Sequence, residues 1–302
     1  MTASPDEIRR KIDGLDYSIS LLKKEREFLW RELFREDLNR NQYACEKQTR
    51  RTAEFFFERN FLIVNLKKSE PNADDRAYDL AKNFGDHYNT IIPFLKCLSE
   101  NFKSKSATFT YQTDSLGNSQ ENDLYNICTT MCDFKWIDVK RSDAGLNIEK
   151  IEVPKKYRNF LFDGKWTEYY NRYLIRKVLS SYASKNHVSR YNIYWNVELH
   201  ELSSEEGKVD KELDVVVELN DRFYIFETKS GEIPFGKLID NARLFDSSNS
   251  RYILCTLQKG WKQRHFEPHC LFPLPQLEKN LNDLLDKDFP TNQQRQNDCG
   301  EV

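Results

Sequence analysis

Residues 212–229 read ELDVVVELNDRFYIFETK, two apolar runs separated by the polar pair Asn220–Asp221. Such a pair between apolar runs is typical of a tight β-hairpin. Counting outward from the turn, Asp214 on the first strand falls opposite Glu227 on the second. Glu227 and Lys229 are two residues apart, so their side chains share one face of the second strand. The sequence therefore predicts a hairpin whose open end carries two carboxylates and a lysine.

This group of charges suits one kind of chemistry. Hydrolysis of a phosphodiester requires oxygen ligands for a hard divalent cation and a positive group beside the negative charge that develops. Two carboxylates and a lysine supply both, and burying them without a metal or counter-charge would cost free energy. The same acid-x-Lys pattern also occurs on many strands as an exposed ion pair, so its meaning depends on the rest of the chain.

The overall composition bounds the setting of such a site. The chain has 302 residues, enough for two domains of ~100 to 150 residues each. Hydrophobic residues make up 39% of the chain and charged residues 31%, which indicates a globular protein with an extensive solvated surface. The net charge of −2 excludes a global basic field, so any contact with nucleic acid must come from local patches.

Cysteine usage and the lack of targeting signals predict a cytoplasmic protein. The seven cysteines are an odd number without a pairing rhythm, which favours a reducing compartment. The first residues contain no apolar signal region, and no run of ~18 apolar residues occurs, so the sequence predicts neither secretion nor a membrane span.

Residues 1–70 are predicted to form a long helix and a connector. Apolar residues recur at alternating steps of four and three across residues 5–35, and only Arg26 interrupts the pattern. The members of this stripe are Ile8, Ile12, Leu15, Ile19, Leu22, Leu29 and Leu33. A stripe this narrow is more typical of a coiled-coil seam than of a core helix, and it predicts a homodimer formed through residues 5–35. The alternative is a helical hairpin packed on the next domain.

Residues 71–155 follow the pattern helix, helix, hairpin, which predicts a winged-helix-like module. The helices are expected near residues 88–102 and 121–134, and the hairpin follows across residues 136–151. The second helix carries three acidic side chains and almost no basic ones, the wrong charge for phosphate contacts. We therefore interpret the module as a spacer or protein-contact element, with DNA reading as the alternative.

Residues 156–285 are predicted to form an α/β domain with a mixed sheet flanked by helices. The expected elements, in order, are a helix over 166–181, a strand over 191–199, the hairpin, a helix over 236–245 and a strand over 251–257. Residues 286–302 are polar and rich in Gln and Asn, which predicts a disordered tail.

These residues, in this order of elements, resemble a known family. Glu168 on a helix, Asp214 on a strand and Glu227-Thr228-Lys229 on the next strand resemble the PD-(D/E)xK nuclease superfamily, which has a restriction-endonuclease-like fold. The resemblance implies a metal-dependent endonuclease acting on DNA or RNA. By the same resemblance, Asp214 and Glu227 would bind Mg²⁺ or Mn²⁺, and the backbone carbonyl of Thr228 would be a further ligand. Glu168 would complete the metal shell, and Lys229 would position the attacking water or help to deprotonate it.

Three short motifs narrow this resemblance. GKWTE at 164–168, NVE at 196–198 and ELDVVV at 212–217 are similar to the nuclease domain of CRISPR-associated nucleases activated by cyclic oligoadenylate. The similarity covers about residues 75–275 and implies a role in defence against phage or mobile elements. Those proteins begin with a sensor domain for the cyclic nucleotide. This chain has a predicted coiled coil at that place and too few residues for such a domain, which puts activation by that ligand in doubt.

Basic residues interleaved with aromatic ones suggest where nucleic acid would bind. Such mixtures suit backbone contacts and base stacking, although each patch alone could be a solvated face. The candidates are Lys155, Lys156, Arg158, Arg172, Arg176, Lys259, Lys262 and Arg264. The competing hypothesis is a catalytically inactive nuclease-like scaffold, or a coiled-coil adaptor, that recruits protein partners.

Overall fold

The computed structural model describes residues 5–39, 47–67, 75–106, 108–186, 191–202, 210–230, 235–257 and 270–290. The chain divides into two compact units. The first consists of residues 1–68 and 192–213, and the second of residues 69–191 and 214–302. The division differs from the ranges expected from the sequence, which kept residues 156–285 together.

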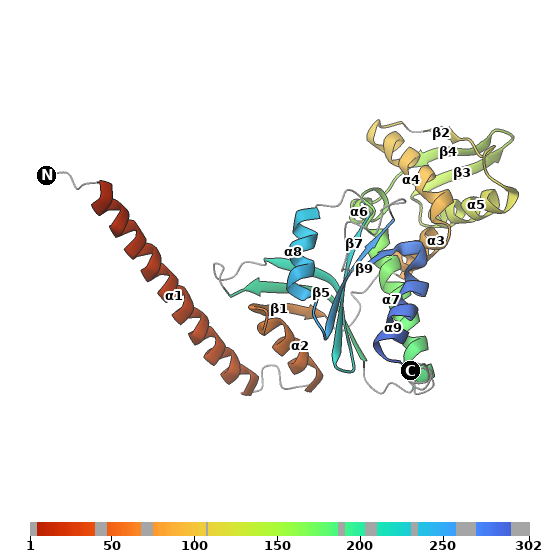
Figure 1. Ribbon diagram of the computed structural model, residues 1–302. Helices are drawn as coiled ribbons and strands as arrows, with labels where there is room; N and C mark the ends of the chain where they lie inside the picture. The colour runs from red at the N-terminus through yellow and green to blue at the C-terminus, as the bar shows by residue number, and fades with distance from the viewer. Residues whose placement is uncertain are drawn as a thin grey trace, which may run out of the picture. The chain divides into compact units, whose positions relative to one another are not determined.

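The first unit contains two helices and two strands in the part that the structure describes (Figure 1). These are α1 (Pro5–Asn39), α2 (Lys47–Phe57), β1 (Phe61–Lys67) and β5 (Tyr191–Glu201). The long helix predicted at the N-terminus is confirmed by α1. Strands β1 and β5 pair antiparallel, and Leu202 packs with Ala53 and Phe57 of α2 in a small buried cluster. Neither α2 nor β1 was predicted, because the stretch after α1 is polar and was expected to be a connector.

The second unit begins with a small sheet and three helices (Figure 1). Its elements are α3 (Asp75–Asp86), α4 (Tyr88–Lys103), β2 (Phe109–Tyr111), α5 (Asn118–Asp133), β3 (Ile137–Ser142) and β4 (Gly145–Ile151). The two predicted helices and the hairpin are confirmed, whereas α3 and β2 were not foreseen. At the hairpin turn, Gly145 has φ 126°, and a Cβ there would lie 2.3 Å from the carbonyl oxygen of Tyr111. Only glycine fits this turn. The winged-helix interpretation stays a prediction.

The rest of the second unit is a mixed sheet flanked by helices, as the sequence predicted. The strands are β6 (Lys211–Leu219), β7 (Arg222–Lys229), β8 (Ser250–Thr256) and β9 (Cys270–Pro273). Strand β7 pairs antiparallel with β6 and parallel with β8, which in turn pairs parallel with β9. The predicted hairpin register is confirmed, because Val215 lies opposite Phe226, one step inside Asp214 and Glu227. Strand β9 was not predicted; it extends the sheet beyond β8, which was expected to be the last strand.

Four helices complete this part of the second unit. They are α6 (Lys155–Phe162), α7 (Trp166–Asn186), α8 (Phe235–Phe245) and α9 (Leu277–Asp288). Helix α7 packs against α3 and α9, and α8 packs against β8 (Figure 1). Ile175 on α7 and Leu285 on α9 are fully buried, so both helices present apolar side chains to the core. None of the described helices combines the length and apolar character needed to cross a membrane.

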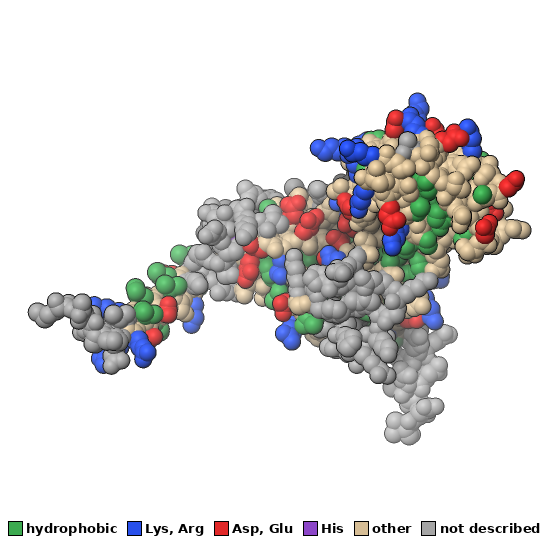
Figure 2. Space-filling view, turned by 90° about the horizontal axis from the view of Figure 1, so that it is seen from above, with side chains coloured by type: hydrophobic (Ala, Val, Ile, Leu, Met, Phe, Trp, Pro, Cys, Tyr) green, Lys and Arg blue, Asp and Glu red, His purple; other side chains and the backbone are tan. Residues whose placement is uncertain are grey.

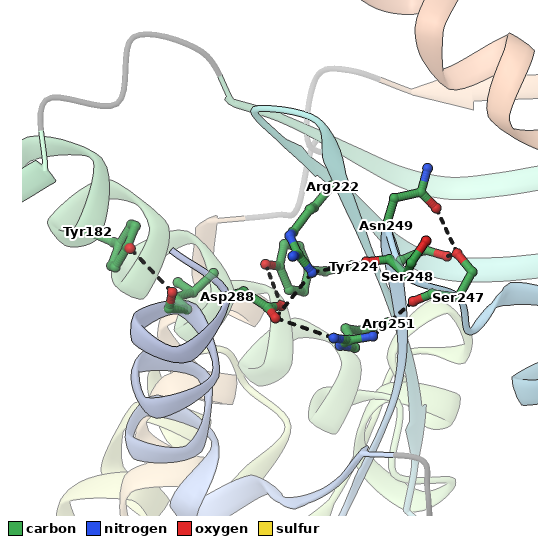
Figure 3. A network of polar contacts seen from close by, with 10 residues as sticks. Tyr182, Arg222, Tyr224, Ser247, Ser248, Asn249, Arg251 and Asp288 are labelled. Carbon is green, nitrogen blue, oxygen red and sulfur yellow. Dashed lines mark hydrogen bonds and ion pairs between the residues drawn. The ribbon is translucent and has the colours of Figure 1, made fainter. Parts of the chain in front are cut away.

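The C-terminal end of α9 is tied to β7 and β8 through Asp288 (Figure 3). The hydroxyl of Tyr224 donates to Asp288 Oδ2 at 3.0 Å, while Arg222 and Arg251 donate to Oδ1 at 3.2 and 3.4 Å. The Asp288 side chain is only 4% exposed, so these contacts form in a largely desolvated place. The predicted tail from residue 286 therefore begins inside α9, and residues 291–302 lie outside the described residues.

Candidate active site

The start of α7 meets the end of β7. Gly164 has φ 76°, and a Cβ there would lie 2.5 Å from Ser230 Oγ, the residue that directly follows β7. The hydroxyl of Thr167 donates to the Gly164 carbonyl at 2.7 Å and fixes the first turn of the helix. Glycine is required here both for its positive φ and for the close approach. The consequence is that Glu168, in the first turn of α7, is held beside the strand that ends in Lys229.

The open end of the β6–β7 hairpin brings the other three candidate residues together. The backbone N–H of Thr228 donates to Asp214 Oδ2 at 2.7 Å. Lys229 Nζ lies 2.5 Å from Glu227 Oε1. The Glu227 side chain is 10% exposed and that of Lys229 is 32% exposed, so this ion pair lies at the edge of the core rather than on the open surface.

The second turn of α7 adds two residues that sequence reasoning missed or misplaced. Asn171 Nδ2 donates to Thr228 Oγ1 at 2.6 Å, and both side chains are buried. An Arg172 guanidinium nitrogen lies 3.8 Å from Glu168 Oε2. Arg172 was assigned to a surface patch, but it is 3% exposed and belongs beside the carboxylates. The signal was available, because residues three and four positions after Glu168 share its face of the helix.

The pKa values of Glu168 and Asp214 are both raised, and the charge of Asp214 contributes to the shift of Glu168. Burial raises the pKa of Glu168, and the negative charge of Asp214 raises it further, against the opposing effect of nearby cations. Burial also raises the pKa of Asp214, although the hydrogen bond from the Thr228 N–H and the charge of Lys229 work in the other direction. Two carboxyl groups with raised pKa values and a shared set of cations are more typical of a functional site than of a structural ion pair.

Lys229 is held in its protonated form. Burial works to lower its pKa, but the charge of Glu227 and its hydrogen bond, together with the charges of Asp214 and Glu168, outweigh burial and raise the pKa above its ordinary value. A lysine that keeps its proton cannot accept one from water. Of the two roles left open by the sequence, this environment favours positioning water and stabilising negative charge.

The donor atoms fit a hard divalent cation in type and charge. Asp214, Glu227 and Glu168 offer carboxylate oxygens, which Mg²⁺ and Mn²⁺ prefer. The N–H and C=O of one strand residue point to the same side, so the Thr228 carbonyl faces the same side as its N–H, toward Asp214. A cation would also relieve the repulsion between Asp214 and Glu168. Within the described ranges, no group of three His, Cys, Asp or Glu side chains is placed so that it could hold a metal ion, so the fit is one of donor type and not of a site already formed.

Apart from the buried Arg172, the predicted nucleic-acid-binding residues fall into three sets. Lys155 and Lys156 line a cavity of about 820 Å³ together with Lys165 and Tyr169. Lys165 Nζ lies 4.0 Å from Glu168 Oε2, so this cavity adjoins the carboxylates. Arg158 and Arg176 are exposed, and Arg158 Nε donates to the Val153 carbonyl at 3.2 Å. Lys259, Lys262 and Arg264 lie outside the described residues.

The raised pKa of Glu168 predicts a pH-dependent stability in the absence of divalent cation. The folded carboxyl keeps its proton at a pH where the unfolded one, with its ordinary pKa of 4.5, has lost it. The free energy of unfolding should therefore fall as the pH rises from 4.5 through the raised pKa.

Urea unfolding in EDTA from pH 4.5 to about pH 8, with wild type and Glu168→Gln side by side, checks this expectation. The free energy of unfolding of Glu168→Gln should fall less with rising pH than that of wild type. The variant should therefore become more stable relative to wild type as the pH rises. Parallel curves for the two proteins would show that Glu168 titrates normally.

Comparison with known proteins yields similarity in structure only. No family model matches the chain, and no curated protein matches it. Solved structures that resemble the protein include VC1899 from Vibrio cholerae, with 15% identity and a TM-score of 0.49, and Can2 from Sulfobacillus thermosulfidooxidans in complex with cyclic tetra-adenylate, with 16% identity and a TM-score of 0.48. They cover 78% and 76% of this chain, which spans only 60% and 59% of theirs. At these values the function has to be argued from the site itself.

Proposed function

We propose that this protein is a metal-dependent phosphodiesterase that cleaves nucleic acid at the site formed by Glu168, Asp214, Glu227 and Lys229. The observation that supports it is the convergence of charges at this place: the charge of Asp214 raises the pKa of Glu168, and the charges of Glu227, Asp214 and Glu168 all raise the pKa of Lys229. The two carboxylates come from a helix and a strand that the chain brings together, and their repulsion is the cost of keeping oxygen donors close. A bound cation would offset that cost.

In this proposal each side chain has a distinct task. Asp214, Glu227 and the Thr228 carbonyl would hold Mg²⁺ or Mn²⁺, and Glu168 would complete the shell. The bound ion supplies Lewis-acid activation of water and of the phosphoryl oxygen. Lys229 would donate hydrogen bonds to the attacking water and stabilise the charge that develops on the phosphate oxygens.

Two further residues would keep these groups in position. Arg172 lies close enough to Glu168 to hold its carboxylate, at 3.8 Å. Asn171 fixes the position of Thr228 from the same helix through a hydrogen bond of 2.6 Å. A catalytic site keeps its geometry when buried side chains hold the reacting groups in place.

The cavity beside Glu168 supports nucleic acid as the substrate. Lys155, Lys156 and Lys165 supply positive charge for a phosphate backbone, and Tyr169 lines the same cavity with an aromatic ring. The distance of 4.0 Å between Lys165 Nζ and Glu168 Oε2 connects this basic surface to the proposed site of cleavage. A strand bound along the lysines would therefore reach the carboxylates without crossing the core.

Cleavage assays with the purified full chain test the proposal. Plasmid, single-stranded DNA and RNA are each incubated with Mg²⁺, with Mn²⁺ and with EDTA, and fragments are resolved on gels. We expect cleavage of at least one substrate with one of the ions and none with EDTA. Cleavage that persists in EDTA would contradict metal dependence. Binding of all three substrates with no cleavage under any condition would favour the inactive scaffold.

A further inference from the structure

Helix α1 carries a stripe of apolar side chains that the described structure leaves exposed. Its described members are 48% to 65% exposed: Ile12, Leu15, Ile19, Leu22 and Leu29. Figure 2 shows hydrophobic side chains gathered along the described part of this helix, with charged side chains beside them. Helices in proteins owe most of their stability to the packing of an apolar face. A stripe of this length on a 35-residue helix therefore calls for a covering surface.

The residue types in the stripe specify what kind of surface covers it. In a heptad frame, Ile12 and Ile19 occupy a positions, and Leu15, Leu22 and Leu29 occupy d positions. Isoleucine at a with leucine at d favours two parallel strands over trimers and tetramers. The pattern thus indicates a single partner helix of the same kind and direction.

Charges beside the stripe agree with a second copy in parallel register. Lys11 occupies the g position before Asp16 at the following e position, and both side chains are exposed. In a parallel dimer these two positions face each other across the seam, once on each side because of the two-fold symmetry. Each Lys11 would therefore meet the Asp16 of the other copy. The pairing is self-complementary, as a homodimer requires.

We infer that α1 joins two copies of this chain as a parallel, in-register, two-stranded coiled coil. The inference does not depend on the proposed nuclease activity, since it rests on the stripe and the charges of α1 alone. It also selects one of the two interpretations that the sequence left open. A helical hairpin within one chain would place its helices antiparallel, where Lys11 and Asp16 would no longer be matched.

The mass of the full chain in solution tests the inference. Light scattering after gel filtration should give twice the 36.0 kDa of one chain. Leu15→Glu combined with Leu22→Glu should halve that mass, because both changes put charge into the seam. A matched control combines Leu21→Glu with Phe28→Glu, since these residues are 48% and 60% exposed on the same helix but lie at c positions. The control should remain a dimer.

Three outcomes would overturn the inference. A wild-type mass of one chain excludes the dimer, and loss of the dimer in the control excludes the assigned seam. Orientation is tested by Ile12→Cys under oxidised glutathione, with Leu21→Cys as the control. A parallel register brings the two Ile12 positions together, so only Ile12→Cys should give a new covalent dimer on a non-reducing gel. A dimer by mass that does not crosslink through position 12 would exclude the parallel register.

Discussion

Replacing Asp214 with asparagine is expected to lower the rate of cleavage by about 10³-fold, with little change in the binding of substrate. The amide keeps the size of the carboxylate but removes the charge that would hold the cation. Burial and the Thr228 hydrogen bond show that the Asp214 side chain is fixed in place, so water cannot easily replace it as a ligand. Steady-state kinetics on the best substrate, with Mg²⁺ or Mn²⁺ varied, measure the effect.

Glu212→Gln is the matched control for this change. Glu212 lies on the same strand two residues earlier and is exposed, so its loss should leave the rate within about twofold of wild type. Lys229→Met should resemble Asp214→Asn in rate but retain cation binding, because the lysine is not a proposed ligand. Isothermal titration with Mn²⁺ separates the two variants. Equal cleavage by wild type and Asp214→Asn would exclude the proposed site.

Replacing Asp288 with asparagine is expected to destabilise the fold by about 2 to 3 kcal/mol. The carboxylate receives hydrogen bonds from Tyr224, Arg222 and Arg251 and is almost fully buried (Figure 3). The amide cannot balance the charge of two guanidinium groups. Because both arginines are about 30% exposed, water recovers part of the loss, which is why the estimate is at the lower end for a buried pair.

Thermal unfolding of the two proteins measures this effect. The midpoint should fall by roughly 5 to 10 °C for a unit of this size. Asp283→Asn, an exposed aspartate on the same helix, is the control and should shift the midpoint by no more than about 1 °C. A variant at Asp288 as stable as the control would show that α9 is held by its apolar face alone.

The hairpin was predictable because its information is local. The Asn220–Asp221 turn, where Asn220 adopts φ 53°, fixes the register, and the register alone places Asp214 next to Glu227. The helix that carries Glu168 was also predictable, since its start signal, Gly164, is adjacent in sequence. Both elements can be predicted from neighbouring residues, without information on distant parts of the chain.

The parts that could not be predicted depend on contacts between remote segments. Strand β1 becomes a strand by pairing with β5, which follows it by more than a hundred residues in the chain. Helix α9 was not predicted, and the tail was expected from residue 286 because the end of the chain is polar; Asp288 is buried through partners on β7 and β8. Asn171 likewise reads as an ordinary helix residue until Thr228 is placed beside it. Sequence periodicity shows which side chains are apolar, but it does not show which polar side chains form contacts with each other.

The hydrogen bond between Asn171 and Thr228 joins residues 57 positions apart, and that separation sets an order in time. At a synthesis rate of ~5 to 20 residues per second, α7 leaves the ribosome roughly 3 to 11 s before the strand it holds. The hydrogen bond between Tyr224 and Asp288 also has to wait, because Asp288 lies 64 positions after Tyr224. A nascent chain therefore contains Glu168 long before it contains a working site. If the protein is the nuclease proposed above, a nascent chain stays inactive until β7 has joined α7.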